Sequence, residues 1–307
     1  MLDKHTSRWL DGKSRVQRER RLRALGRFQQ WLQGRYGIEP KALLAKARRG
    51  GHEPERADRI LREYSRFLID EKRNAKTSAA QWYGVLRKYF TANGVDLGRY
   101  PRKTGVKSVY EKDTVLSQAS VKEMVQSCDK PRDRFVIAFL AQSGQRIGIL
   151  TAMKRSMITK VASGHGIVKV PQIFPNLRGE NVNELELPYT FVIGRDTMRM
   201  LGELPLYEGG WLLNISLRQM GRIVDEAARA VRIQEKERTD MGRSWSTVHP
   251  NTFRKYWRNR VKEAEIHPFL MMHMMGYRIP SVLGSYVHTD EELLKAYKKA
   301  ESKLVVQ

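Results

Sequence analysis

The 307-residue chain has a single cysteine, Cys128, and no long hydrophobic segment. One cysteine excludes an intramolecular disulfide and any zinc site that needs several cysteines. The longest uninterrupted apolar run, Phe135 to Ala141, is far shorter than the about 20 residues that span a bilayer. Residues 1–13 carry charges where a signal peptide has an apolar core. We therefore expect a cytoplasmic protein in a reducing compartment, with no membrane partner.

Acidic residues are scarce relative to basic ones. The chain has 57 Lys and Arg residues against 33 Asp and Glu residues, which gives a net charge of +24. Residues 1–112 hold 28 basic and 12 acidic residues, whereas residues 113–307 hold 29 and 21. Such an excess favours a polyanionic partner, and it is densest in the first third of the chain. Charge alone does not identify the partner, because some basic proteins are only well solvated or bind nucleic acid without specificity.

Residues 1–98 show the apolar periodicity of amphipathic helices. Three stripes share this spacing: Leu22, Leu25, Phe28, Trp31 and Leu32; Ile60, Leu61, Tyr64, Phe67 and Leu68; Trp82, Val85, Leu86, Tyr89 and Phe90. We interpret the aromatic stripes as the core of a small helical bundle rather than as platforms for base stacking. Residues 99–113 lack periodicity and are mostly basic, which indicates a linker that can follow a phosphate backbone.

The rest of the chain, residues 114–307, is expected to be a second domain. Apolar periodicity predicts helices near 135–140, 196–204, 216–231, 250–264 and 291–304. Between them, Ile167–Val170 and Glu184–Leu187 are β-branched or alternating, with a Pro, Asn and Gly turn from Pro175 to Asn181. The predicted fold class is therefore mainly α, with a small β-hairpin or sheet in the C-terminal domain.

Four segments whose residues are candidates for catalysis follow one another in the second domain. Ser143–Gly148 places an arginine just after the apolar helix, and the predicted hairpin carries basic residues. Pro250–Lys255 places Arg254 three residues after an asparagine. Met275–Tyr277 comes last, with Tyr286 nine residues beyond Tyr277. Each segment alone is a weak signal of function, but the order and spacing of the four segments together are a specific one.

These segments resemble the tyrosine recombinase and integrase family. That family shows a Thr-Gly-Leu-Arg-type motif, a hairpin lysine, a His-x-x-Arg motif, and Leu-Gly-His followed by a nucleophilic tyrosine. The resemblance covers roughly residues 115–300, and the helical region ahead of it is similar to the family's core-binding domain. The Arg-Ile-Gly variant of the first motif looks nearer to integrases of archaea and mobile elements than to bacterial Xer proteins.

The resemblance implies a two-domain C-clamp around double-stranded DNA. Residues 1–98 would form the core-binding domain, 99–113 the linker, and 114–307 the catalytic domain with its C-terminal packing helix. The family acts as a homo-tetramer on DNA, so we expect a chain that is monomeric or weakly associated when free and located at the nucleoid. The helix near 291–304 (Leu293, Leu294, Tyr297 and Leu304) would dock on a neighbouring subunit.

The family's chemistry accounts for the residue types in these segments. A phosphodiester gains negative charge in the transition state, and Arg146 and Arg254 would stabilise it with fixed, permanently charged donors. Tyr286 would be the nucleophile that forms a 3′-phosphotyrosyl link. This chemistry needs no metal or cofactor, and the sequence shows no Walker-type loop or carboxylate pair.

Several positions depart from the family pattern. The histidine three residues before the second arginine is replaced by Asn251, which can donate a hydrogen bond but cannot transfer a proton. His249 stands five residues before Arg254 and would point elsewhere if the helix extended that far, so we favour Asn251. Tyr277 occupies the third histidine position, and Ile149 replaces an acidic residue.

The general acid is left open between two basic residues. Lys169 lies on the first predicted strand and is able to donate a proton, whereas Arg178 lies in the turn but is a very weak acid. Two rival functions also stay open: relaxation of DNA by a type IB topoisomerase, and a basic DNA-binding protein that lacks activity.

Overall fold

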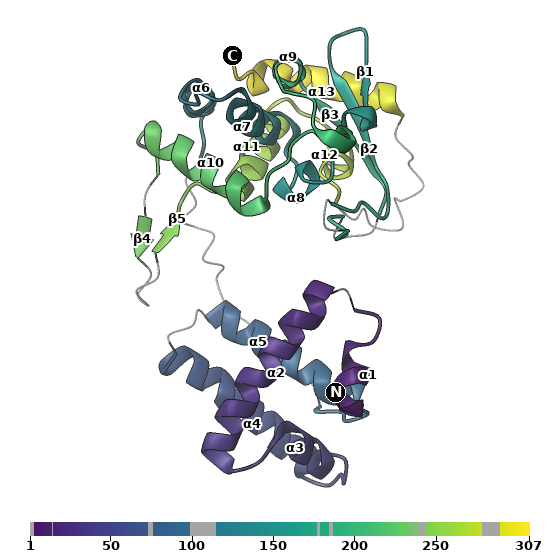
Figure 1. Cartoon of the computed structure of the whole chain (residues 1–307), viewed down its shortest axis with the longest axis vertical. Coiled ribbons are helices and arrows are strands. Elements are labelled where there is room, and N and C mark those ends of the chain that lie inside the picture. Colours follow the sequence, from purple (N-terminus) through teal and green to yellow (C-terminus); the bar gives the residue numbers. More distant parts are fainter. Residues whose placement is uncertain are drawn as a thin grey trace. The chain divides into compact units, whose positions relative to one another are not determined.

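A computed structural model of the chain describes residues 3–13, 15–72, 76–98, 115–176, 179–183, 187–234, 236–238, 244–277 and 289–307. The described residues form two compact units, one within residues 3–98 and one within residues 115–238 and 244–307 (Figure 1). The predicted linker, residues 99–113, lies outside the described residues, as do Glu184–Glu186, Arg178 and Tyr286. The predicted C-clamp concerns how the two units are placed on DNA and stays a prediction.

The N-terminal unit is built from helices (Figure 1). They are α1 (Lys4–Leu10), α2 (Arg15–Tyr36), α3 (Pro40–Ala47), α4 (Glu53–Asp70) and α5 (Lys76–Ala92). The predicted stripes supply a single core, in which Phe28, Tyr64 and Leu86 are almost completely buried. The short helix α3 was not expected from periodicity; Pro40 begins it, and Leu43 and Leu44 join the core.

The C-terminal unit surrounds one apolar helix. Its helices are α6 (Gln118–Gln126), α7 (Pro131–Ser143), α8 (Ile147–Leu150), α9 (Arg195–Gly202), α10 (Leu217–Ala230), α11 (Pro250–Glu263), α12 (Pro268–Met274) and α13 (Asp290–Leu304). Every residue of α7 from Phe135 to Ser143 is buried, because the helix packs against α6, α9, α10, α11 and β3. The solidly apolar run that the sequence shows is therefore the centre of this core.

The strands of this unit form a small antiparallel sheet in the order β1-β2-β3, and β4 (Lys236–Arg238) pairs with β5 (Ser244–Ser246). The sheet strands are β1 (Ile158–Lys160), β2 (Gly166–Val170) and β3 (Tyr189–Ile193). A mainly helical chain with this sheet confirms the predicted fold class. The strand that pairs with β2 lies later in the chain than expected: β2 pairs with β3 at Tyr189–Ile193, whereas Glu184–Leu187 was predicted and its first three residues lie outside the described residues. Pro188 has no N–H for a ladder, so the strand begins at the residue after it.

The C-terminal helix α13 packs against α11, α12 and β3 of its own unit. Leu293, Tyr297 and Leu304 are almost fully buried there. The hydroxyl of Tyr297 donates to the carbonyl of Gln142 at 2.8 Å, and the side-chain amide of Gln142 donates to the carbonyl of Leu304 at 3.2 Å. The expected docking of this helix on a neighbouring subunit stays a prediction. Within the described residues, no helix is both long and apolar enough to cross a membrane.

Candidate active site

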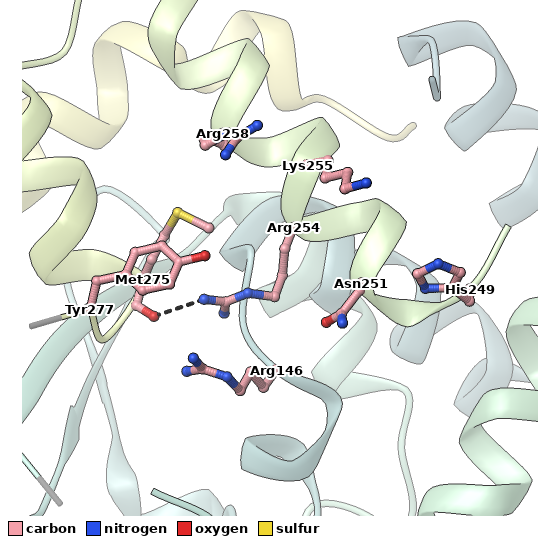
Figure 2. Close-up of a pocket in the computed structure, with 8 residues that line it drawn as sticks. All are labelled: Arg146, His249, Asn251, Arg254, Lys255, Arg258, Met275 and Tyr277. Carbon is pink, nitrogen blue, oxygen red and sulfur yellow. Dashed lines mark hydrogen bonds between the residues drawn. The ribbon is translucent and has the colours of Figure 1, made fainter. Parts of the chain in front are cut away.

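Two of the predicted motif arginines share one cavity of about 230 Å³ with six other described residues (Figure 2). The lining residues are Arg146, His249, Asn251, Arg254, Lys255, Arg258, Met275 and Tyr277. Four of these eight side chains are permanently or ordinarily cationic, and none is Asp or Glu. The cavity therefore suits an anion with oxygen atoms on more than one side.

Arg254 is the most deeply buried cation of this cavity, with 6% of its surface exposed. It lies on α11, and its guanidinium donates to the carbonyl of Gly144 at 2.8 Å and to that of Met275 at 3.1 Å (Figure 2 shows the second bond). Burial lowers the pKa of Arg254, an effect that Tyr277 opposes. Because arginine starts far above neutrality, the group stays charged and is held rigidly beside the cavity.

Arg146 reaches the same cavity from the loop between α7 and α8. Helix α7 ends at Gly144, whose φ of +63° is the left-handed conformation that glycine adopts most readily. A Cβ atom on Gly144 would lie 2.7 Å from the Trp257 ring, so this turn sits directly on α11. The indole of Trp257 donates to the carbonyl of Gln142 at 3.0 Å and fixes the end of α7. The loop that presents Arg146 is thus clamped to the helix that presents Arg254.

Tyr277 completes this group at the end of α12. Its backbone N–H donates to the carbonyl of Met272 at 2.9 Å, which closes the turn that follows the helix. The guanidinium carbons of Arg254 and Arg146 lie 5.2 Å and 5.8 Å from the centre of the Tyr277 ring. Cation–π contacts of this length hold the two like charges against the same aromatic ring. The Tyr277 side chain is 38% exposed, so its hydroxyl is accessible from the cavity.

A buried hydrogen-bond network supports the turn beneath Tyr277. The Gln145 amide donates to the carbonyl of Met274 at 2.6 Å and accepts from the hydroxyl of Tyr189 at 2.9 Å. Burial raises the pKa of Tyr189 to about 12, so this hydroxyl stays a neutral donor. A Cβ atom on Gly276 would approach the Tyr189 ring to 2.7 Å. Gln145 and Tyr189 therefore join the loop of Arg146 to the turn of Tyr277.

Asn251 and His249 both line the cavity, although the sequence argument favoured only Asn251. Helix α11 begins at Pro250, and His249 is its extended N-cap residue, with φ −148° and ψ 169°. The helical rotation that would have turned His249 away therefore does not apply to it. Figure 2 shows Asn251 between Arg254 and His249. The predicted helix start at Pro250 is confirmed, and a proline suits this first helical position.

Lys169 is not among the residues that line the cavity. It lies at the exposed position of β2, opposite Thr190 of β3. Its ammonium group forms an ion pair with Asp290, the first residue of α13, at 2.8 Å. The structure thus brings together Arg146, Asn251, Arg254 and Tyr277 but leaves Lys169 elsewhere, while the predicted Arg178 and Tyr286 lie outside the described residues.

Sequence reasoning set His249 aside and did not assign two further cavity residues, Lys255 and Arg258, to the site. Lys255 and Arg258 follow Asn251 at four and seven residues, the helical spacing that puts side chains on one face. This row extends the positive lining along α11. Within the described residues, no group of three or more His, Cys, Asp or Glu side chains is placed to hold a metal ion.

No protein-family model matches this sequence, and no curated protein matches it. Solved structures do resemble it. The Tn1549 transposon integrase in complex with a circular intermediate DNA has a TM-score of 0.58 at 13% identity, covering 96% of this chain and 98% of that one. The same integrase with transposon right end DNA gives 0.54 at 14%, with the same coverage.

XerH site-specific recombinase bound to its difH substrate gives a TM-score of 0.52 at 11% identity and covers 78% of this chain and 69% of that one. At such low identity these matches concern the fold and not the individual residues. The matches to the transposon integrase extend over nearly the whole of both chains. This chain therefore has the fold of the tyrosine recombinases and integrases.

Proposed function

We propose that this protein is a site-specific DNA recombinase or integrase that cleaves and rejoins DNA through a 3′-phosphotyrosyl intermediate. One observation carries the proposal: Arg146 and Arg254 lie against Tyr277 in one acid-free cavity, on a fold shared with enzymes solved on DNA. The net charge of +24 supports double-stranded DNA as the partner. Assembly as a tetramer on DNA is part of the same proposal.

The two arginines would hold the scissile phosphate. Their guanidinium groups donate to the non-bridging oxygens and neutralise the charge that grows on them in the transition state. Arg254 enters this role already oriented by the carbonyls of Gly144 and Met275, so little reorganisation is needed during the reaction. Asn251 and Tyr277 would donate further hydrogen bonds to the same phosphate.

Tyr286 would supply the nucleophile. Its phenolic oxygen attacks phosphorus, the bond from phosphorus to the 5′ oxygen breaks, and the phenolic proton passes to water. The leaving 5′ oxygen gains a proton and becomes a free hydroxyl. The covalent link conserves the phosphodiester energy, so that a 5′ hydroxyl from another strand can reverse the step. Lys169 and Arg178 are the sequence-based candidates for that proton, and the ion pair with Asp290 holds Lys169 apart from the cavity in this structure.

Covalent capture on nicked DNA tests the proposal. A pool of nicked suicide duplexes with randomised sequence is incubated with the protein, and strands that stay attached in denaturing detergent are sequenced. The wild type should retain a defined sequence, and Tyr286→Phe should retain none. Tyr207→Phe is the matched control, since Tyr207 is outside the cavity and should leave capture intact.

Other outcomes would point to other functions. Absence of any covalent species would favour a DNA-binding protein without activity. A complex that survives Tyr286→Phe would remove Tyr286 as the nucleophile. Relaxation of supercoiled DNA without dependence on sequence would favour a topoisomerase.

A further inference from the structure

The proton for the leaving 5′ oxygen has few sources in the cavity. Arg146, Arg254 and Arg258 are too weakly acidic to release a proton readily. The amide of Asn251 does not exchange protons in this way. Lys169 is paired with Asp290 at 2.8 Å and is not a lining residue. The anion-binding groups of the site are therefore present, while the acid predicted from the sequence is not among them.

His249 is an imidazole on the wall of this same cavity. Its backbone is anchored at both ends: its N–H donates to the Thr252 hydroxyl at 3.1 Å, and its carbonyl accepts from the Thr252 N–H at 2.8 Å. Because Thr252 is itself buried in the first turn of α11, these two hydrogen bonds fix the position of the His249 backbone, which carries the imidazole. Figure 2 shows His249 at the opposite end of the labelled group from Tyr277, with Asn251 between His249 and Arg254.

The chemistry of the lining residues singles out His249. Imidazole is the side chain whose protonation ordinarily changes between about pH 5 and pH 8. The other lining residues that carry exchangeable protons are Lys255, Tyr277 and the arginines. A lysine ammonium is a much weaker acid than an imidazolium, so among the described lining residues His249 is better suited than Lys255 both to give a proton and to take it back.

We propose that His249 is the general acid of strand cleavage, in place of the hairpin residue and of the motif position that Asn251 occupies. This rests on the proposed recombinase function. As the tyrosine oxygen bonds to phosphorus and the bond from phosphorus to the 5′ oxygen breaks, the imidazolium of His249 passes its proton to that oxygen. In ligation the neutral imidazole takes the proton from the attacking 5′ hydroxyl and becomes imidazolium again. The 5′ oxygen bonds to phosphorus, the bond from phosphorus to the tyrosine oxygen breaks, and that oxygen regains a proton from water.

A duplex with sulfur in place of the bridging 5′ oxygen tests this role. A thiolate leaves without protonation far more readily than an alkoxide, because thiols are much stronger acids than alcohols. His249→Gln should slow single-turnover formation of the covalent complex on the oxygen duplex by about 10²- to 10⁴-fold. On the sulfur duplex it should react within a few-fold of the wild type. His249→Asn, which differs in length, should show the same pattern.

Matched variants separate proton transfer from other roles. Arg254→Lys should be slow on both duplexes, since it weakens charge stabilisation rather than proton transfer. Lys169→Ala should keep the wild-type ratio of oxygen to sulfur cleavage. Urea unfolding and DNA retention of each variant show whether the fold and DNA binding persist.

Three results would overturn the assignment: wild-type cleavage of the oxygen duplex by both His249 variants, equal loss on both duplexes, or selective rescue of Lys169→Ala by sulfur. If the wild type itself captures neither duplex, the recombinase function fails as well. If the wild type captures DNA and any of the three results is found, only the assignment of His249 as general acid fails.

Discussion

Arg254 combines two tasks at the scale of a single residue. Its guanidinium ties the end of α7 to the end of α12 through the carbonyls of Gly144 and Met275, and it lines the cavity with its charge. Arg146 lines the same cavity from a half-buried position at the start of α8. The two arginines should therefore contribute equally to phosphate binding but unequally to stability.

Substitution of each arginine by alanine should reveal this difference. Both Arg254→Ala and Arg146→Ala should lower single-turnover cleavage by at least about 10²-fold, because each removes a donor to the transition state. Arg254→Ala should also lower the free energy of unfolding by about 1–3 kcal/mol, since two buried carbonyls lose their partner. Urea unfolding should show a smaller loss for Arg146→Ala. Equal losses of stability would contradict the dual role of Arg254.

Three elements meet at the cavity, and glycines permit their contact. The end of α7 meets the middle of α11 at Gly144, where a Cβ atom would lie 2.7 Å from the Trp257 ring. The turn after α12 meets β3 at Gly276, where a Cβ atom would lie 2.7 Å from the Tyr189 ring. These approaches bring Arg146, Arg254 and Tyr277 together. The site is therefore sensitive to the packing of whole elements, besides the identity of its polar groups.

Gly144→Ala tests this packing. The left-handed backbone alone costs an L-residue about 1–2 kcal/mol, and the clash with Trp257 should add about 1–3 kcal/mol of unfolding free energy. Gly164→Ala is the control, because its φ is +81° and its Cβ atom would make an ordinary 3.5 Å contact with Arg195. Urea unfolding of both variants gives the comparison. Equal destabilisation would show that the Trp257 contact is unimportant.

Helix α13 provides a second test at the scale of elements. Leu304 is completely buried in the core of its own unit, so Leu304→Ala should cost about 2–5 kcal/mol of unfolding free energy. Leu206→Ala is a matched control, since Leu206 is 83% exposed and should change stability by less than about 0.5 kcal/mol. If the helix instead docked on a neighbour, Leu304→Ala would leave the unfolding of the monomer unchanged.

At the scale of the whole molecule, buried tyrosines in both units share one response to pH. Burial raises the pKa of Tyr64, Tyr89, Tyr189 and Tyr256 to about 12. In the unfolded chain these phenols ionise near pH 10. Stability should be unaffected below about pH 10 and be lost as the pH rises from there through the folded pKa, by up to about 2.7 kcal/mol for each tyrosine.

Urea unfolding at pH 9, 10 and 11 measures this loss. Tyr64→Phe removes one ionising group from the N-terminal core and should reduce the loss between pH 10 and pH 11. An identical pH dependence in Tyr64→Phe and the wild type would show that Tyr64 ionises alike in both states.

Much of this protein follows from its sequence, because the signals are local. Helical periodicity is set by 3.6 residues per turn, so the stripes around Phe28 and Tyr64 predicted buried helix faces wherever the helices pack. The order of the motifs predicted a pair of arginines for one anion, and the structure places Arg146 and Arg254 at one cavity. The mainly helical fold class follows from the same local patterns.

The remaining features depend on contacts between distant elements. The strand partner of β2, the ion pair of Lys169 with Asp290 and the burial of α13 on its own core join segments that are far apart in the chain. His249 reaches the cavity because α11 begins one residue after it and packs against α7. Spacing along a chain determines which side chains share one face of an element. Only the combined burial of all the faces decides which elements meet, and hence which basic or acidic groups share a site.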